Sequence, residues 1–268
     1  MKKLTTCLLL FIIGHGSLCS QEFVIDYNYY PAIGPEKNIA IMYFGGSSGG
    51  YPFDPYYQNK LTKLGYPCIG VAYFKTKNTP KILSEIPLEY FEQAIEMYLE
   101  RPEIMGKKLV IIGISKGGEL SLLLASKYSG INGVIAEVPS HVVWEGINAD
   151  WGSSNSSSWS YQGEPIPYVP DDTSSQNSFL ELYELSLQQK EYVEKARIPV
   201  EKIKGPILIV SGVDDKMWPS TFMGDEVIKR LKDNNFPYWY RHDAYQNAGH
   251  ILHPKYLRFG GTKKFLSL

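Results

Sequence analysis

The stretch GISKGGELSLLLAS, residues 113–126, decides the fold of this chain. The apolar run LVIIGI (109–114) predicts a buried strand, and GELSLLLASKY (118–128) predicts a helix. Between them, residues 113–117 match the pattern G-x-S-x-G, in which small residues allow a sharp turn and expose the serine hydroxyl at the end of the strand. Ser115 is therefore a candidate nucleophile. The alternative is a serine that caps the N-terminus of the helix.

The alternation of strands and helices continues on both sides of this turn. Apolar runs predict further strands, and most of these runs are apolar on both faces, which is typical of a parallel sheet covered by helices on both sides. These runs lie at 39–44, 68–74, 134–138, 206–212 and 238–245. Residues 87–100 and 220–234 have helical periodicity. The order predicts an α/β fold, with residues 21–268 forming one doubly wound domain.

One segment, 141–178, interrupts this alternation of strands and helices and is rich in serine, proline and aromatic residues. Because the alternation resumes after it, we interpret it as a surface excursion rather than a linker. With the helix-like run 179–196 it predicts an irregular cap insertion around 141–197. Its aromatic residues either line an apolar pocket or pack the loop against the domain. They are Trp144, Trp151, Trp159, Tyr161 and Tyr168.

The composition argues against several classes of ligand. The chain has 268 residues and a formal net charge of −1, with no long basic run, so nucleic acid binding is not expected. The glycine-rich loop 44–50 lacks the Gly-Lys-Ser/Thr ending of a nucleotide-binding P-loop. No group of histidines and carboxylates has the spacing of metal ligands. We therefore expect neither a cofactor nor a metal.

The N-terminus has the layout of a secretory signal peptide, residues 1–20. Two lysines precede an apolar run that is too short to span a bilayer, and small residues follow it. We expect an exported protein, periplasmic or secreted, without stable membrane insertion after cleavage; a lipid anchor at Cys19 is the less favoured alternative. Cleavage leaves Cys68 as the remaining cysteine, in an apolar run that predicts a buried side chain.

A serine nucleophile needs a base and an acid that orients the base. Asp214 and Asp215 follow the strand 206–212, and His250 follows the strand 238–245. All of them lie where parallel strands end, at the edge of the sheet that binds ligands. We predict Asp215 as the acid, because it lies three residues after Gly212, and keep Asp214 as the alternative.

The other histidines are weaker candidates for the base. His141 lies in the irregular segment and His242 lies inside a strand, where a structural role is expected. His253 is the nearest competitor, but His250 follows Ala-Gly, which gives its loop room to present the ring.

Backbone amides near Ser115 are the expected stabilisers of a developing oxyanion. The amide of Lys116 lies at the start of the predicted helix. The loop after strand 39–44 supplies the second donor, from Gly45, Gly46 or Ser47.

Several segments together resemble one family. GISKGGELSLLLAS, LEYFEQAIEMYLERPEI, GYPCIGVAYF, IPVEKIKGPILIVSGVDDKMWPS and AGHILHPKY are similar to the catalytic domain shared by acyl-CoA thioesterases and bile acid-CoA:amino acid N-acyltransferases. The similarity runs from about residue 36 to about 258. It implies a dienelactone hydrolase-like α/β-hydrolase fold with a triad of Ser115, Asp215 and His250.

The resemblance also implies a reaction. Members that transfer acyl groups to amino acids typically use cysteine as the nucleophile, whereas the thioesterases use serine, so Ser115 favours hydrolysis of a small-molecule ester or thioester. Transfer to an amino acid amine is the alternative within enzymes. A non-catalytic or truncated binding protein is the alternative outside them. The animal members carry an N-terminal β-sandwich domain and continue into a final helix, and we expect this chain to lack both.

Overall fold

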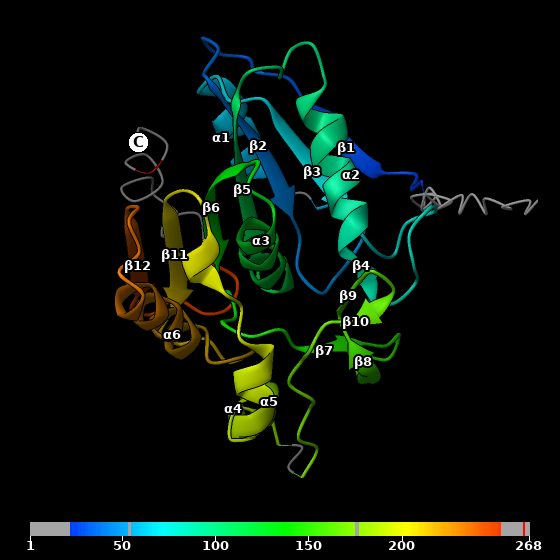
Figure 1. Cartoon of the computed structure of the whole chain (residues 1–268), viewed down its shortest axis with the longest axis vertical. Helices are drawn as coiled ribbons and strands as arrows, with labels where there is room; N and C mark the ends of the chain where they lie inside the picture. The colour runs from blue at the N-terminus through cyan, green and yellow to red at the C-terminus, as the bar shows by residue number, and fades with distance from the viewer. Residues whose placement is uncertain (1–21, 53–54, 175–176, 253–264, 266–268) are drawn as a thin grey trace, which may run out of the picture.

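The centre of the molecule is a twisted sheet of seven strands in the order β1-β3-β2-β5-β6-β11-β12 (Figure 1). The computed structural model describes residues 22–52, 55–174, 177–252 and 265. The strands are β1 (Asp26–Tyr30), β2 (Ile39–Phe44), β3 (Cys68–Ala72), β5 (Lys108–Ile114), β6 (Ile131–Glu137), β11 (Ile207–Gly212) and β12 (Tyr240–Tyr245). β1 pairs antiparallel with β3, and the other pairs are parallel.

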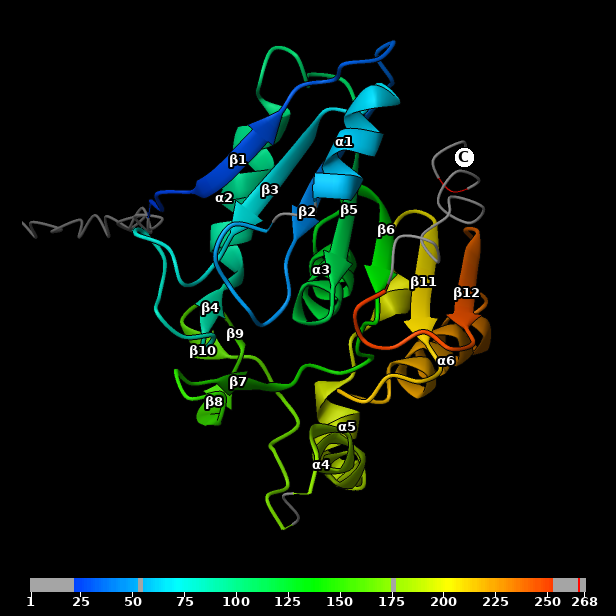
Figure 2. The same cartoon turned by 180° about the vertical axis from the view of Figure 1, so that it is seen from behind.

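Helices cover both faces of this sheet because its central strands are apolar on both faces. In β5, Leu109 and Ile111 are buried on the face of α2 and α3, whereas Val110 and Ile112 join Leu61 of α1 on the other. Figures 1 and 2 show α2 and α3 on one side of the sheet and α1 on the opposite side. The helices are α1 (Pro55–Lys63), α2 (Leu88–Leu99), α3 (Lys116–Lys127) and α6 (Ser220–Asp233).

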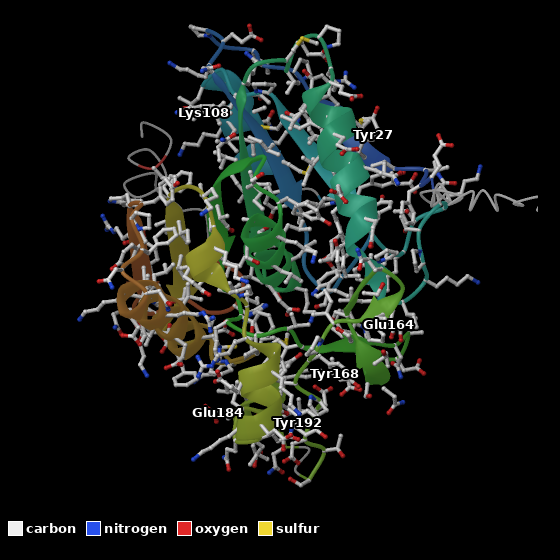
Figure 3. All side chains as sticks on the ribbon, viewed as in Figure 1. Tyr27, Lys108, Glu164, Tyr168, Glu184 and Tyr192 are labelled. Carbon is white, nitrogen blue, oxygen red and sulfur yellow. The ribbon has the colours of Figure 1, made fainter. Side chains whose placement is uncertain are left out.

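The cap lies beyond the carboxyl ends of the parallel strands. In Figure 3, Tyr168, Glu184 and Tyr192 mark it at the end of the molecule opposite Lys108, the first residue of β5. Its elements are β7 (Glu145–Ile147), β8 (Ser153–Ser157), β9 (Trp159–Tyr161), β10 (Glu164–Pro165), α4 (Phe179–Ser186) and α5 (Lys190–Ala196). The 3-10 turn η1 (Val200–Lys202) follows the cap and packs against α3 and α6. β9 also pairs with β4 (Ile86–Pro87), which joins the cap to the start of α2.

The predicted α/β fold with a mostly parallel sheet is confirmed, and the cap needs two corrections. The segment 141–178 is not wholly irregular, since β7 to β10 lie within it. The predicted helix 179–196 is two helices, α4 and α5. The hydroxyl of Ser186 donates to the carbonyl of Leu182 and accepts from the amide of Asp172, which fixes the last turn of α4 against the cap.

Two further expectations fall on the chain termini. The predicted signal peptide and Cys19 lie outside the described residues, and so does the segment after Leu252 apart from Phe265. Within the part of the chain that is described, no helix has both the length and the apolar character needed to cross a bilayer.

Candidate active site

Ser115 occupies a strained turn between β5 and α3. Its backbone has φ 57° and ψ −121°, a conformation that non-glycine residues adopt rarely and that is typically held in place at functional sites. Gly117 allows the turn to be this tight, because a Cβ there would collide with the carbonyl oxygens of Phe44 and Gly45. The side chain of Ser115 makes no capping hydrogen bond to α3, so it is not the helix cap that the alternative interpretation required.

The hydroxyl of Ser115 instead contacts His250. The two atoms, Oγ and Nε2, are 2.9 Å apart. The other ring nitrogen of His250, Nδ1, lies 2.9 Å from Oδ2 and 3.2 Å from Oδ1 of Asp215. With the proton on Nδ1 donated to the carboxylate, Nε2 is left to accept the proton of the serine hydroxyl. The three residues follow β5, β11 and β12, and the loops after these strands bring them together at one edge of the sheet.

Asp215 is held firmly, whereas Asp214 points away. The buried carboxylate of Asp215 accepts hydrogen bonds from the amides of Met217, at 2.9 Å, and Trp218, at 3.3 Å. Asp214 is exposed, and its amide donates to the carbonyl of Ala248, which ties this loop to the one that carries His250. The geometry therefore brings Asp215, not Asp214, to the histidine.

The competing histidines have other surroundings. His242 bridges β12 to α6 and β11, with Nδ1 2.9 Å from Oδ1 of Asp225 and Nε2 2.7 Å from Oγ of Ser211. His141, at the start of the cap segment, is buried, and burial lowers its pKa to about 3. His253 lies outside the described residues.

The loop after β2 lies against Ser115. A Cβ at Gly46 would be 3.1 Å from the Cβ of Ser115, so the backbone of this loop approaches the nucleophile closely. The buried hydroxyl of Tyr73 donates to the carbonyl of Gly45 at 2.6 Å, which fixes the loop. Ser47 lines the same cavity as Ser115. On the other side, Lys116 is the first residue of α3, where an amide has no acceptor within the helix.

A cavity of about 890 Å³ opens above Ser115, between the sheet and the cap. Its walls are mostly apolar. They include Ile147, Trp151, Phe179, Leu182, Tyr183, Met217 and Trp218. Of the aromatic residues considered from the sequence, Trp151 lines this cavity, whereas Trp144 and Trp159 are buried in the packing of the cap. Sequence reasoning missed Tyr183 and Trp218, which stack edge to face at 5.5 Å between their ring centres.

Sequence reasoning considered the backbone amide of Lys116 but missed the role of its side chain. It is buried and forms an ion pair with Glu119, one turn along α3, at 2.9 Å. Glu119 further accepts a hydrogen bond of 2.7 Å from the indole of Trp159 and one of 3.3 Å from the amide of Trp144. The pair therefore fastens the cap to the helix that carries the nucleophile. The spacing of the lysine and glutamate in SKGGE, three residues apart, was the available signal.

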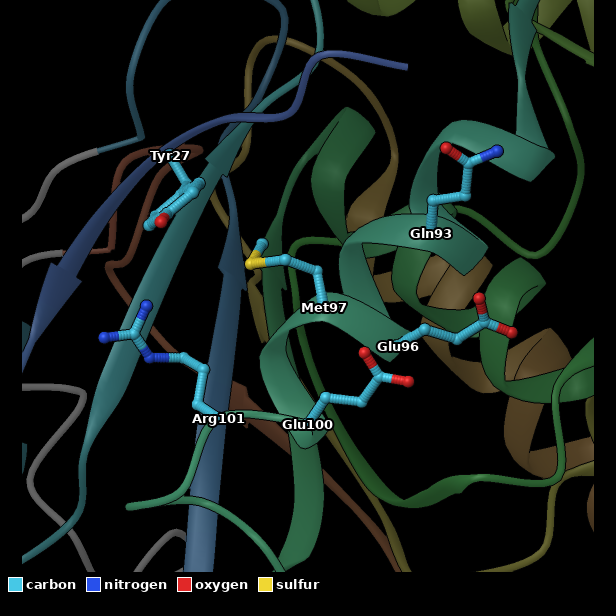
Figure 4. Close-up of a pocket in the computed structure, with 6 residues that line it drawn as sticks. All are labelled: Tyr27, Gln93, Glu96, Met97, Glu100 and Arg101. Atoms are coloured by element: carbon cyan, nitrogen blue, oxygen red, sulfur yellow. The ribbon is translucent and has the colours of Figure 1, made fainter. Parts of the chain in front are cut away.

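A second cavity, of about 480 Å³, lies on the outer side of α2 beside β1 (Figure 4). Its lining residues are Tyr27, Gln93, Glu96, Met97, Glu100 and Arg101. The guanidinium of Arg101 already pairs with Glu103 and covers the ring of Tyr29. This cavity shares no residue with the one above Ser115, and it holds no nucleophile.

Metal and thiol chemistry find little support among the described residues. No group of three histidine, cysteine, aspartate or glutamate side chains there is arranged to hold a metal ion. The thiol of Cys68 is buried in β3, and burial raises its pKa to about 12, so it packs as an apolar side chain. The Ser115 cavity is therefore the candidate active site.

The fold is that of the α/β-hydrolases. The chain is similar to the acylaminoacyl peptidase of Pyrococcus horikoshii, with a TM-score of 0.63 and 18% identity over 91% of this chain and 39% of that one. It is also similar to a dienelactone hydrolase-like protein of Klebsiella pneumoniae, with a TM-score of 0.56 and 12% identity over 91% of this chain and 99% of the other. At such identities these likenesses establish the fold alone.

The sequence narrows this class to one family. Residues 86–264 match the family "BAAT / Acyl-CoA thioester hydrolase C terminal", and the chain belongs to it. Human acyl-coenzyme A thioesterase 1 is 30% identical over 235 residues, 84% of this chain and 51% of that protein. Mouse bile acid-CoA:amino acid N-acyltransferase is 27% identical over 231 residues, 84% of this chain and 51% of the relative. The chain thus spans about half the length of these relatives.

Proposed function

We propose that this protein is a serine hydrolase that cleaves the ester or thioester bond of a small acyl substrate. The observation that carries the proposal is the continuous hydrogen-bonded series from Ser115 through His250 to Asp215, at 2.9 Å for each link, on the floor of an apolar cavity. Membership of a family that includes acyl-CoA thioesterases supports the same reaction class.

In the first half of the reaction, Ser115 is acylated. Its Oγ attacks the carbonyl carbon while its proton passes to Nε2 of His250. The carboxylate of Asp215 holds the Nδ1 proton and balances the positive charge on the ring. As the tetrahedral intermediate collapses, the histidine returns the proton to the departing alcohol or thiol, and an acyl-serine ester remains.

The second half reverses the proton transfers with water as the nucleophile. His250 takes a proton from the water, the hydroxide attacks the acyl-serine carbonyl, and Ser115 leaves with the proton restored. In both halves the carbonyl oxygen becomes an oxyanion. The amide of Lys116 and an amide of the loop Gly45, Gly46 and Ser47 are the proposed donors to it, because this loop lies within contact of Ser115.

Covalent labelling tests the nucleophile directly. A fluorophosphonate probe should label the folded wild type at Ser115, and Ser115→Ala should abolish labelling. Ser126→Ala is the matched control, since Ser126 lies on α3, the helix that follows Ser115, and its hydroxyl donates to the carbonyl of Leu123. A folded wild type that stays unlabelled would contradict the proposal.

Acyl transfer to an amino acid is the second candidate, because the mouse N-acyltransferase is 27% identical to this chain. The acyl-serine ester favours water as the acceptor, and we expect free acid as the main product. Incubation with an acyl thioester plus glycine or taurine, followed by mass spectrometry, separates the two reactions. An amide product in excess of the acid would replace hydrolysis with transfer.

A binding protein without catalysis is the third candidate. The complete serine, histidine and aspartate series argues against it. Equal turnover of an ester by the wild type and Ser115→Ala would favour it.

We further propose that the protein is exported. The lysines and apolar run of residues 1–20 support a cleaved signal peptide. Cell fractionation of the full chain and of a chain lacking residues 2–20 tests this, since only the full chain should leave the cytoplasm.

A further inference from the structure

The cavity above Ser115 contains one carboxyl group that the proposed reaction does not use. Asp171 lies in the cap and lines the same cavity as Ser115. The walls of this cavity are rich in aromatic rings: Trp151, Phe179, Tyr183 and Trp218. A plain alkyl chain offers no polar or charged group that could interact with a carboxyl group on these walls.

The backbone of Asp171 is fixed in this position. Its amide donates a hydrogen bond of 2.7 Å to Oε2 of Glu145, a buried residue of β7. Glu145 in turn accepts a hydrogen bond from the hydroxyl of Ser153 on β8. Asp171 therefore presents its carboxyl group from a braced segment of the cap.

The surroundings of Asp171 carry an excess of negative charge. Among the described residues, the carboxyl groups of Glu119, Glu145 and Asp171 interact with one ammonium group, that of Lys116. Lys116 is already committed, because its Nζ lies 2.9 Å and 3.1 Å from the two carboxylate oxygens of Glu119.

The carboxyl group of Asp171 is largely ionised under the conditions of an ordinary assay. Burial and the neighbouring Glu145 raise its pKa to about 6, so at pH 7.5 most molecules carry the charge. A carboxylate in an aromatic cavity, whose interacting ammonium group on Lys116 is already paired with Glu119, is complementary to a positively charged ligand group.

We propose that Asp171 is a specificity-determining residue that binds a cationic ammonium group on the substrate. Aromatic faces attract such a cation through their quadrupoles, and the carboxylate supplies the opposite charge. This inference rests on the proposed hydrolase function, since the substrate is the ester or thioester that Ser115 attacks.

Matched substrate pairs test the proposal and show which part of the substrate carries the cation. The first pair has the charge in the acyl group: the p-nitrophenyl esters of 6-(trimethylammonio)hexanoate and of its neutral isostere, 7,7-dimethyloctanoate. The second pair has it in the leaving group: butyrylthiocholine and 3,3-dimethylbutyl thiobutyrate. We expect the wild type to prefer the cationic member of at least one pair by about tenfold in kcat/KM.

The substitution Asp171→Asn removes the charge and keeps the shape, and it should abolish this preference. Asp172→Asn is the matched control, because the neighbouring Asp172 accepts a hydrogen bond from the amide of Ser174 and does not line the cavity. The control should keep the wild-type ratio. Equal ratios for both variants and the wild type, or no cationic preference in either pair, would overturn the assignment.

A binding measurement separates this proposal from the proposed function. Trp151 and Trp218 line the cavity, so tryptophan fluorescence of the wild type should report binding of hexyltrimethylammonium and not of octan-1-ol. Should no ester be cleaved, this cation would still bind if the inference holds, and Asp171→Asn would weaken it. If esters are cleaved but the cation binds no better than the alcohol, the hydrolase proposal survives and the role of Asp171 fails.

Discussion

The ammonium group of Lys116 lies 2.9 Å from a carboxylate oxygen of Glu119, and the two side chains are only 2% and 0% exposed. The pair stands directly beside the candidate nucleophile and receives the indole of Trp159 from the cap. Removing one partner would leave the other buried without its counter-charge, which typically costs about 3–5 kcal/mol. The pair therefore links the stability of the cap to that of the α3 helix.

We expect Glu119→Gln to lower the melting temperature by roughly 10 °C, and Lys116→Met to have a similar effect. The double variant should lose less than the sum of the two, because no unpaired charge remains. Glu191→Gln is the control: its exposed ion pair with Lys195 on α5 contributes little, so the melting temperature should stay unchanged. Additive losses in the double variant, measured by calorimetry, would show that the two charges do not depend on each other.

The acid of the proposed triad is distinguished from its neighbour by a pair of substitutions. Asp215→Asn should reduce kcat by about 10³–10⁴-fold, because an amide no longer selects the Nδ1-protonated ring of His250. Asp214→Asn should leave kcat near that of the wild type, since this side chain is exposed. Steady-state kinetics on one p-nitrophenyl ester settles the choice, and the reverse pattern would make Asp214 the acid.

The sequence predicted this part of the site because the residues lie at points that local patterns mark. Ser115 follows an apolar strand within a glycine turn, and Asp215 and His250 follow later strands, so a parallel sheet had to bring their ends to one edge. The strand limits were also close: residues 39–44 were predicted and β2 is Ile39–Phe44.

The cap was less predictable because its structure depends on distant contacts. The helical pattern of 179–196 gave no sign of a break, yet the bond from the amide of Asp172 to Ser186 fixes the end of α4. Likewise, nothing local indicated that Tyr183 would face the cavity or that β9 would pair with β4, 73 residues earlier at Ile86–Trp159. These contacts join segments far apart in the sequence, so local sequence patterns do not predict them.

His141 should make the stability of the protein depend on acid. It is buried beside the ring of Phe222, and its Nδ1 has no hydrogen-bond partner among the described residues. Because burial lowers its pKa from 6.5 to about 3, the unfolded state binds a proton more readily than the folded state. The stability associated with neutral His141 is therefore complete above pH 6.5 and is lost as the pH falls towards 3.

The variant His141→Leu lacks this term. Relative to the wild type, it should gain up to about 1.4 kcal/mol of unfolding free energy for each pH unit below 6.5. Urea unfolding of both proteins between pH 4.5 and 7.5 measures the difference, in which the contributions of the unchanged carboxyl groups cancel. Parallel stability curves across this range would show that His141 does not stay neutral in the folded protein.

Two glycines of the loop after β2 should separate an effect on catalysis from an effect on folding. In Gly46→Ala the new Cβ would lie 3.1 Å from the Cβ and 3.6 Å from the Oγ of Ser115. Crowding of the nucleophile and displacement of the proposed oxyanion donors should reduce kcat/KM by about 10–100-fold, with little change in melting temperature.

In Gly50→Ala the Cβ meets nothing within 4 Å, but φ is +76° there, so the cost is backbone strain of about 1 kcal/mol. Its melting temperature should fall while kcat/KM for a p-nitrophenyl ester changes little. If Gly46→Ala keeps full activity, the loop does not supply the second oxyanion donor, and that role passes to another part of the cavity.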